Sequence, residues 1–344
     1  MAIVAGFGNP LLDITIKIHD DKLLQKYNLK IDDQSQIKEN EMKNLLQDIK
    51  DFSSAHTLGG SVLNTLRVFQ WLNSNNNSCS YMIGAIGNDY EGKCLKSLAE
   101  EDGVETLFAI SQEKSTGVSV ALVQNETRCL VAYVGAAETF SIKNLEQITQ
   151  NWKLIENASV FYIEGFFLTD RHEVTKHIMQ WTRSEKKLLM YNMSAPYISQ
   201  ENSSMVKYII ENCDILIGNT NEFKAYLDIH EPNSTPLDYA LKLNKSFLQQ
   251  TNFKYRKMIL ITDGPNPITC IYGDNEKIIV STEKLSTEKI KDTTGAGDAF
   301  AAGFISGLFK DFPPDKCIKY GSWAALQIIQ QVGCKIPDYS PDFN

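Results

Sequence analysis

Long apolar runs are missing from this 344-residue chain. No stretch approaches the 18 or more apolar residues that a membrane-spanning helix requires. The first ten residues, MAIVAGFGNP, lack the basic segment and long apolar core of a secretory signal. We therefore expect no membrane partner and a cytoplasmic location, with the nucleus as a second compartment to consider.

Positive charge is also scarce, since 34 Lys and Arg face 42 Asp and Glu and the net charge is -8. This balance argues against a nucleic-acid or anionic-membrane partner, so an anionic substrate has to be held by local charges. The seven cysteines are scattered and never spaced as Cys-x-x-Cys. They are typical of reduced thiols in a cytosolic protein.

The second half of the chain alternates between short apolar runs and amphipathic segments. We expect strands at 160–164, 188–192, 215–218 and 258–262, and helices at 171–184, at 202–212 and from Asn221 onward. This order predicts one large α/β domain with a parallel sheet and helices on both faces. Gly165, Asn192, Asn219 and Asp263 lie at the ends of these strands, so one sheet edge collects the polar residues.

The first half has a different pattern. Residues 11–18 alternate apolar and polar side chains, which predicts a half-exposed strand with Asp13 on its polar side. Residues 19–52 are polar and predict an excursion from the main sheet, with a helix at 39–49. Residues 116–134 predict a β-hairpin, with Arg128 just after its turn.

The segment KDTTGAGDAFAAGF, residues 291–304, carries the strongest indication of chemistry. Gly295 and Gly297 precede an apolar helix, whose free N–H groups would bind an anion. Asp298 lies in the first turn, where a carboxylate repels a phosphate unless it has a chemical role. The pattern therefore favours an anion site with a built-in base. The alternative is an ordinary turn whose acid complements the helix dipole.

Three other motifs are weaker. The Gly6-Phe7-Gly8 turn lacks the third glycine of a dinucleotide site, where Leu11 stands, so an NAD-dependent dehydrogenase is rejected. Residues 87–94 almost form a P-loop, but Cys94 replaces the hydroxyl that binds magnesium. His172 and His177 are spaced one residue too far apart for a zinc helix.

A helix is also predicted to open near residues 58–65. The glycine pair Gly59-Gly60 would let a ligand approach the backbone, with Asn64 one turn further along. The alternative is a simple helix cap formed by Ser61.

The heptad at 292–298 resembles the C-terminal signature of the ribokinase-like (PfkB) family of ATP-dependent sugar and nucleoside kinases. The similarity extends over nearly the whole chain and is most specific for the adenosine-phosphorylating members. The other matching segments are 8–14, 59–61 with Asn64, 116–117, 165–169, 192–196, 214–222, 333–334 and 341–343.

The resemblance implies a three-layer α/β sandwich with a parallel-rich central sheet and a small β-sheet lid. Residues 1–13, 59–115 and 137–344 would form the large domain, and 14–58 and 116–136 the lid. The implied reaction transfers the γ-phosphoryl group of ATP to the 5′-hydroxyl of adenosine, giving AMP and ADP in purine salvage. Mg²⁺ is the implied cofactor and a monomer the implied state, while a need for K⁺ near the heptad stays open.

The resemblance also implies roles for individual residues. Asp298 would be the general base, with an anion hole at 295–297 (Gly295, Ala296 and Gly297) and Arg128 stabilising charge from the lid. Asp13 would bind the ribose hydroxyls. The other substrate contacts implied are Asn9, Gln34, Gly59, Gly60, Ser61, Asn64, Ser119, Leu130, Ala132 and Phe166, with Phe166 packing on adenine. The implied ATP contacts are Asn192, Asn219, Glu222, Thr262 and Gly264, of which Asn219 and Glu222 would organise Mg²⁺ largely through water.

Two positions depart from the family pattern. Gln36 stands where relatives tend to carry an aliphatic residue, and Ser119 where a small thiol is common, so the breadth of nucleoside specificity stays open. One alternative is another nucleoside or sugar kinase of the same superfamily. Another is an inactive nucleoside-binding protein, against which the intact Asp298, Asn219 and Glu222 argue.

Overall fold

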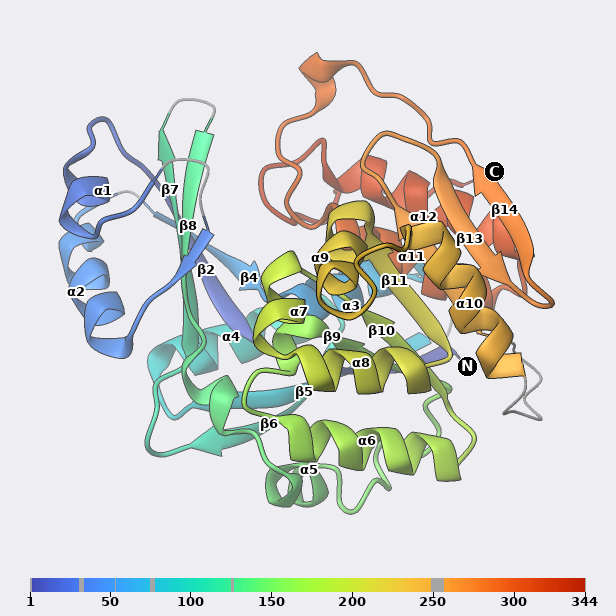
Figure 1. Ribbon diagram of the computed structural model, residues 1–344. Coiled ribbons are helices and arrows are strands. Elements are labelled where there is room, and N and C mark those ends of the chain that lie inside the picture. The colour runs from blue at the N-terminus through green and yellow to red at the C-terminus, as the bar shows by residue number, and fades with distance from the viewer. Residues whose placement is uncertain are drawn as a thin grey trace.

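The computed structural model describes residues 2–30, 34–52, 54–74, 78–124, 127–248 and 257–343, and their strands form two sheets (Figure 1). The larger sheet has nine strands within these ranges, in the order β14-β13-β12-β11-β10-β9-β1-β5-β6. Their bounds are β1 Ala2–Phe7, β5 Ser78–Gly87, β6 Glu105–Ser111, β9 Val160–Glu164, β10 Leu188–Asn192, β11 Ile215–Asn219, β12 Met258–Thr262, β13 Ile268–Tyr272 and β14 Glu276–Val280.

The strands from β12 to β6 are all parallel, and β13 and β14 add an antiparallel edge. All five residues of β9 are buried, as expected where helices cover both faces of a parallel sheet. The parallel strands end at a common edge, which carries Glu164, Asn192 and Asn219. The predicted α/β architecture and its polar edge are confirmed.

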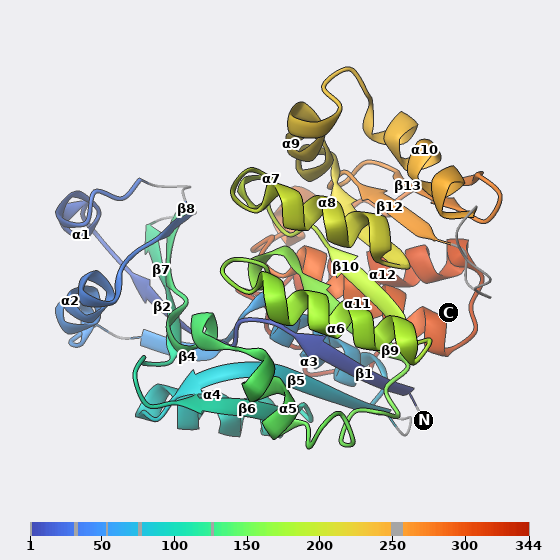
Figure 2. The same ribbon diagram turned by 60° about the horizontal axis from the view of Figure 1, so that its bottom comes forward.

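Helices cover the sheet on both sides. On one face lie α5 Ile142–Ile148, α6 His172–Ser184, α7 Pro196–Glu201, α8 Ser203–Asn212, α9 Thr220–His230 and α10 Pro236–Leu248. On the other lie α3 Ser61–Leu72, α4 Tyr90–Glu101, α11 Ala296–Phe309 and α12 Pro314–Ile328. Figure 2 shows α6 and α8 in front of β9 and β10, with α11 and α12 behind. Each face has its own apolar core.

The smaller sheet stands beside the main body, at the left of Figure 1. Its order is β3-β8-β7-β2-β4, with β2 Leu11–Lys17, β3 Gln34–Gln36, β4 Ser54–Gly59, β7 Gly117–Gln124 and β8 Thr127–Tyr133. The helices α1 Lys22–Lys26 and α2 Glu39–Ile49 pack on one face through Leu24, Met42 and Leu45. The alternation in β2 sends Ile14 and Ile16 into this core and turns Asp13 and Thr15 to the opposite face.

The sequence pattern near the end of the chain predicts a long helix from Pro313 to Val332, but α12 ends at Ile328. Beyond it, the Ile329 carbonyl accepts hydrogen bonds from the N–H groups of Lys291 and Asp292 (2.9 and 3.3 Å). The chain therefore leaves the helix to meet the segment that precedes α11. The helices α1, α5, α7 and α10 were not predicted from the sequence.

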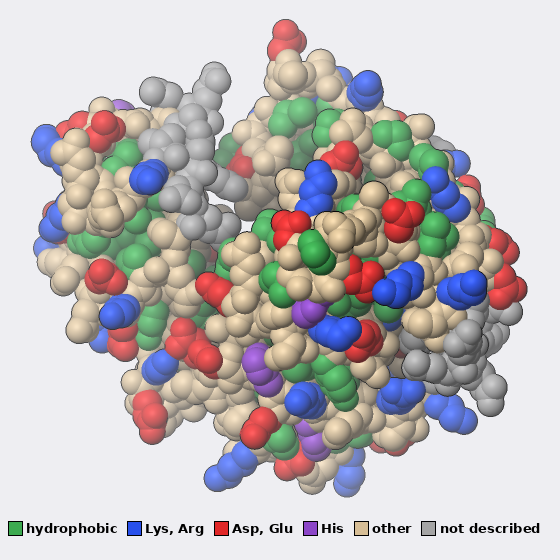
Figure 3. All heavy atoms as spheres, viewed as in Figure 1, with side chains coloured by type: hydrophobic (Ala, Val, Ile, Leu, Met, Phe, Trp, Pro, Cys, Tyr) green, Lys and Arg blue, Asp and Glu red, His purple; other side chains and the backbone are tan. Residues whose placement is uncertain are grey.

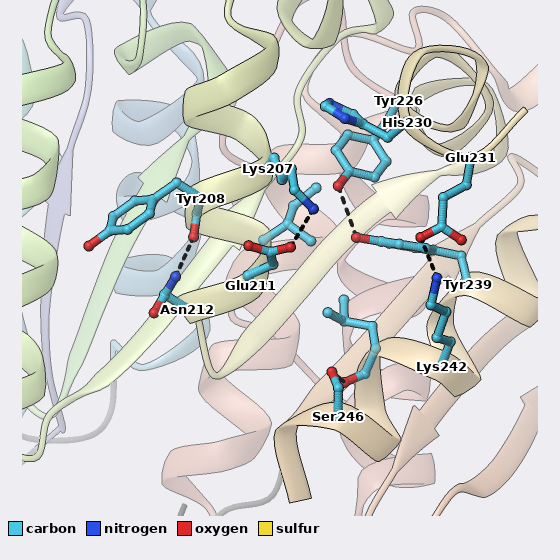
Figure 4. A network of polar contacts seen from close by, with 12 residues as sticks. Lys207, Tyr208, Glu211, Asn212, Tyr226, His230, Glu231, Tyr239, Lys242 and Ser246 are labelled. Atoms are coloured by element: carbon cyan, nitrogen blue, oxygen red, sulfur yellow. Dashed lines mark hydrogen bonds and ion pairs between the residues drawn. The ribbon is translucent and has the colours of Figure 1, made fainter. Parts of the chain in front are cut away.

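Polar contacts join the outer helices α9 and α10 (Figure 4). The hydroxyl of Tyr239 donates to that of Tyr226 at 3.0 Å, and Lys242 pairs with Glu231 at 2.7 Å. None of these four residues lines the cavity described below. We therefore infer that the network stabilises the packing of these helices and does not bind a ligand. Among the described residues, no helix combines the length and apolarity needed to cross a membrane.

Candidate active site

A cavity of about 1250 Å³ lies at the carboxyl ends of the parallel strands and extends under the polar face of the smaller sheet. Figure 3 shows a notch between the smaller lobe, at left, and the main body. Residues from both sheets and from the starts of α3, α9 and α11 line the cavity. This is the sheet edge where open α/β folds bind ligands.

The start of α11 is built to receive an anion. Gly295 precedes the helix with φ of 77°, and a Cβ there would lie 2.7 Å from Cys334 Sγ. No side chain caps the helix. The N–H of Ala296 donates to the Thr293 carbonyl at 3.2 Å, which leaves the N–H groups of Gly297 and Asp298 to bind a ligand. Gly297 lines the cavity and a Cβ on it would meet nothing within 4 Å. The open space at Gly297 is therefore on the ligand side.

Asp298 is held by two donors from α3. The Ser61 hydroxyl donates to its Oδ1 at 2.5 Å, and Asn64 Nδ2 donates to its Oδ2 at 3.0 Å. Burial raises the pKa of this carboxyl, while the two hydrogen bonds oppose the rise. The result is a carboxylate fixed at the cavity surface beside free N–H groups. Ser61 does not cap α3, because Gly60 is the N-cap residue.

Arg67, one turn after Asn64, was missed in the sequence analysis. Its Nη1 donates to Asn64 Oδ1 at 3.3 Å and to the Cys334 carbonyl at 3.1 Å, and its Nε pairs with Asp102 at 2.5 Å. Arg67 therefore orients the Asn64 amide, so that its NH₂ group faces Asp298. It also ties α3 to the segment that supports Gly295.

We expect Arg67→Met to destabilise the fold. Because the change leaves the Cys334 carbonyl and the Asn64 amide oxygen without their donor, the free energy of unfolding should fall by about 1–3 kcal/mol. Urea unfolding would measure the loss. The matched control is Arg183→Met, an exposed arginine near the end of α6, for which we expect a change within about 0.5 kcal/mol. Equal effects of the two changes would contradict this role.

The glycine pair before α3 makes room for two polar groups. A Cβ on Gly59 would lie 2.0 Å from Asp13 Oδ1, so the Asp13 carboxylate packs directly on the backbone at this point. Gly60 has φ of 90°, and a Cβ there would lie 2.1 Å from the Asn9 carbonyl oxygen. Asn9 donates from Nδ2 to the Phe166 carbonyl at 3.0 Å. The pair therefore allows Asp13 and Asn9 to come together at the cavity.

Asn219 and Glu222 form a capping box at the start of α9. Asn219 Oδ1 accepts from the N–H of Glu222 at 2.9 Å, and Glu222 accepts from the backbone and side-chain nitrogens of Asn219 at 2.8 and 2.7 Å. Burial raises the pKa of Glu222 to about 7. Among the described residues, no group of three or more His, Cys, Asp or Glu could hold a metal ion. These oxygens suit a magnesium ion held mainly through water.

Most of the predicted site residues line this one cavity. They are Asn9, Asp13, Gly60, Ser61, Asn64, Ser119, Leu130, Ala132, Phe166, Asn192, Asn219, Glu222, Thr262, Gly264, Gly295, Ala296, Gly297 and Asp298. Gln36, singled out as a departure, lines it as well. Gly59 is not a lining residue and lies against Asp13.

Two predicted residues are only partly described. Gln34 pairs with Leu130, and Arg128 lies in β8 opposite Val123. The side chains of Gln34 and Arg128 lie outside the described part of the chain.

Glu164 was also missed, although it lines the cavity floor and is 1% exposed. The available signal was an acid at the end of an otherwise apolar strand, at the edge where Asn192 and Asn219 were singled out. Also missed were apolar lining residues near the end of the chain, namely Ile290, Ala325, Leu326, Ile329 and Val332. They make the wall of the cavity beside α12 apolar.

A doubly wound sheet with an uncapped helix N-terminus, an acid beside it and a second sheet over the cavity defines a class of phosphoryl-transfer enzymes. The chain belongs to the pfkB family carbohydrate kinases, whose sequence profile matches residues 25–340. This confirms the family indicated by the heptad.

Within that family the chain is similar to adenosine kinases. It is 31% identical to adenosine kinase 2 of Arabidopsis thaliana over 343 residues, covering 99% of this chain and 97% of the relative. The adenosine kinase of Schistosoma mansoni in complex with 2-fluoroadenosine has a TM-score of 0.86 and 32% identity, with 97% of each chain covered. The Anopheles gambiae enzyme in complex with P1,P4-di(adenosine-5) tetraphosphate has a TM-score of 0.83 and 30% identity, covering 99% of this chain and 98% of that one.

Proposed function

We propose that this protein is an adenosine kinase that transfers the γ-phosphoryl group of ATP to the 5′-hydroxyl of adenosine, producing AMP and ADP for purine salvage. The observation that carries the proposal is the Asp298 carboxylate, fixed by Ser61 and Asn64 beside the uncapped start of α11. Full-length similarity to adenosine kinases, one of them solved with 2-fluoroadenosine, supports the choice of substrate.

The nucleoside would bind between the two sheets. The Asp13 carboxylate would accept hydrogen bonds from the 2′- and 3′-hydroxyls of the ribose, and the Gly60 N–H would complete this clamp. Phe166, at the cavity wall beside Asn9, would pack on the base. Ser119, Leu130 and Ala132 on the polar face of the smaller sheet would cover it, and Gln36 would approach the base from the same side. In this arrangement the smaller sheet, with residues 14–58 and 116–136, acts as a lid.

The chemical step would take place at α11. Asp298 accepts the proton of the 5′-hydroxyl while that oxygen forms its bond to the γ-phosphorus. The bond between the γ-phosphorus and the β,γ-bridging oxygen breaks, and ADP leaves with the electron pair. The N–H groups of Gly295 and Gly297 bind the oxygens of the moving group, and Arg128 adds positive charge from the lid. Because protonated Asp298 cannot act as a base, activity should decline on the acid side at a higher pH than for an ordinary aspartate.

The cavity itself is strongly acidic. Its described lining contains one Lys or Arg, Lys284, against seven acids: Asp13, Glu164, Glu201, Glu222, Glu283, Asp292 and Asp298. A free triphosphate would be repelled by those of these acids that are ionised, so ATP would enter with Mg²⁺, which neutralises phosphate charge. Asn219 and Glu222 would hold the ion's water shell, and Asn192, Thr262 and Gly264 would contact the nucleotide.

A substrate comparison tests this proposal. With ATP, Mg²⁺ and both with and without K⁺, adenosine should be the best of adenosine, 2′-deoxyadenosine, inosine and ribose. Because the deoxy compound loses a charge-assisted hydrogen bond to Asp13, its kcat/KM should be lower by about 10- to 100-fold. Coupled detection of ADP would measure the rates.

The variant Asp13→Ala provides the matched comparison. Without the carboxylate, kcat/KM for adenosine should fall toward that for 2′-deoxyadenosine, and the difference between the two values should nearly disappear. Faster turnover of ribose or inosine would refute the choice of substrate. An undiminished preference for adenosine over its deoxy analogue in the variant would refute the role of Asp13.

We also propose that the enzyme works as a monomer in the cytoplasm. All seven cysteines are free, which fits a reducing compartment. Light scattering on the purified protein would test the monomer.

A further inference from the structure

Arg171 is a buried cation that the mechanism above does not use. It stands at the N-cap position of α6 and is 3% exposed. Burial lowers its pKa to about 10, so the guanidinium keeps its charge at neutral pH. Taking a charge out of water is costly, and a cation at this end of a helix also opposes the helix dipole. The reason for an arginine here therefore lies in its contacts.

The guanidinium holds the backbone of the short helical turn η2, Gly165–Phe167. Its Nε donates to the Phe167 carbonyl at 2.8 Å, and its Nη2 donates to the Phe166 carbonyl at 3.0 Å. The Phe166 carbonyl also accepts from Asn9 Nδ2 at 3.0 Å, so both of its lone pairs are used. Because Phe166 lines the cavity, Arg171 and Asn9 together fix the residue that is proposed to pack on the base.

The remaining nitrogen of Arg171, Nη1, reaches the segment that returns from the smaller sheet. It donates to the Ala137 carbonyl in the helical turn η1, Gly135–Thr139, which closely follows β8. In the same turn, the Ala136 N–H donates to the Ser115 carbonyl at 2.8 Å, just before β7 begins. The turn η1 is therefore tied to both chain segments from which the smaller sheet extends, and Arg171 links it to η2.

We propose that Arg171 is a positioning residue for the nucleoside, which holds Phe166 at the cavity wall and in a fixed place relative to the smaller sheet. The inference rests on the proposed binding of adenosine between the two sheets. A planar guanidinium has donors that point in several directions, so one side chain can hold carbonyls of both turns at once. These hydrogen bonds involve neither Asp298 nor the start of α11. Arg171 should therefore affect the binding of adenosine and leave the chemical step nearly unchanged.

Two replacements of Arg171 separate binding from turnover. Arg171→Met removes the three donors described above and should raise the KM for adenosine by about 10-fold. Arg171→Lys keeps the charge but replaces the planar group with a compact ammonium, so it should not restore the wild-type KM. In both variants kcat and the KM for ATP should change little. The control is Arg183→Met, an exposed arginine in the same helix, which should leave all three constants unchanged.

A double variant shows whether Arg171 acts through Phe166. The change Phe166→Ala removes the ring from the cavity wall. If Arg171 acts by holding that ring, adding Arg171→Met to Phe166→Ala should weaken adenosine binding much less than Arg171→Met does alone. Calorimetric titration with adenosine in the absence of ATP measures each dissociation constant without any turnover.

Three results would overturn the proposal. The first is a wild-type dissociation constant for adenosine in Arg171→Lys, which also decides the question if Arg171→Met does not fold. The second is an equal effect of Arg171→Met with and without the Phe166 ring. The third is a parallel loss of kcat, adenosine binding and ATP binding, which would assign Arg171 to the stability of the fold alone.

The proposed function can fail separately. A wild-type protein that binds adenosine without phosphorylating it would refute the kinase activity, and the dissociation constants would still decide the role of Arg171. A wild-type protein that does not bind adenosine would refute both.

Discussion

Replacing Asp298 with Asn should lower kcat by about 10²- to 10⁴-fold, the usual contribution of a general base. The amide has nearly the same shape and retains an oxygen that can accept from Ser61 or Asn64, but it cannot take the proton of the 5′-hydroxyl. The KM for adenosine should change little, since Asp13 and the wall around Phe166 are untouched. Steady-state rates of ADP formation with adenosine measure both constants.

A matched control is available in the next helix. Asp315 also lies in the first turn of a helix, α12, but its side chain is exposed and pairs with Lys319 at 3.5 Å. Asp315→Asn makes the same chemical change at a comparable place outside the cavity, so kcat should stay near the wild-type value. If both variants kept their activity, Asp298 would not be the base.

The second large effect is expected for Gly297→Ala. A Cβ at this position meets no atom within 4 Å apart from its chain neighbours and the backbone of its own helix, and Gly297 lines the cavity, so the added methyl group occupies the space meant for the moving phosphoryl group. Because the anion hole is obstructed, kcat should fall by about 10²- to 10³-fold. The free energy of unfolding should stay the same or rise by up to about 0.5–1 kcal/mol, since alanine has a higher helix propensity than glycine. Activity assays and urea unfolding on the same preparation test both parts.

Gly303→Ala, two turns further along α11, gives the opposite pattern. There a Cβ would lie 2.6 Å from the Tyr320 carbonyl oxygen and 2.7 Å from Gly321 Cα, at the contact between α11 and α12. This variant should unfold at a lower urea concentration than the wild type. The account of Gly297 would be wrong if Gly297→Ala bound and transferred phosphate normally, or if it lost stability as Gly303→Ala is expected to do.

Local patterns predicted the parts of the site that a short segment determines. The glycines and Asp298 lie within one heptad at the start of a helix, so both the anion site and the acid beside it could be inferred from spacing. The alternation in β2 placed Asp13 on the polar face of its strand, and the structure turns it into the cavity. The helix α2 was predicted near residues 39–49, which are its observed bounds.

The missed residues depend on contacts between distant segments. Arg67 looks like an ordinary polar residue of a helix, and its importance comes from Cys334, 267 positions away. Glu164 looks like the polar end of a strand, and only the packing of the sheets and helices places it at the cavity. Asn64 was expected among the substrate contacts, and its hydrogen bond to Asp298 was not foreseen. Such partners depend on how helices and strands pack, which no local spacing encodes.

Identification of the product tests the central claim most directly. Incubation with ATP, Mg²⁺ and adenosine, followed by ³¹P nuclear magnetic resonance, should show 5′-AMP and ADP appearing in equal amounts, and 5′-deoxyadenosine should give neither. Formation of ADP and inorganic phosphate without AMP, or of a phosphate ester at another hydroxyl, would contradict the transfer to the 5′-hydroxyl that the position of Asp298 implies.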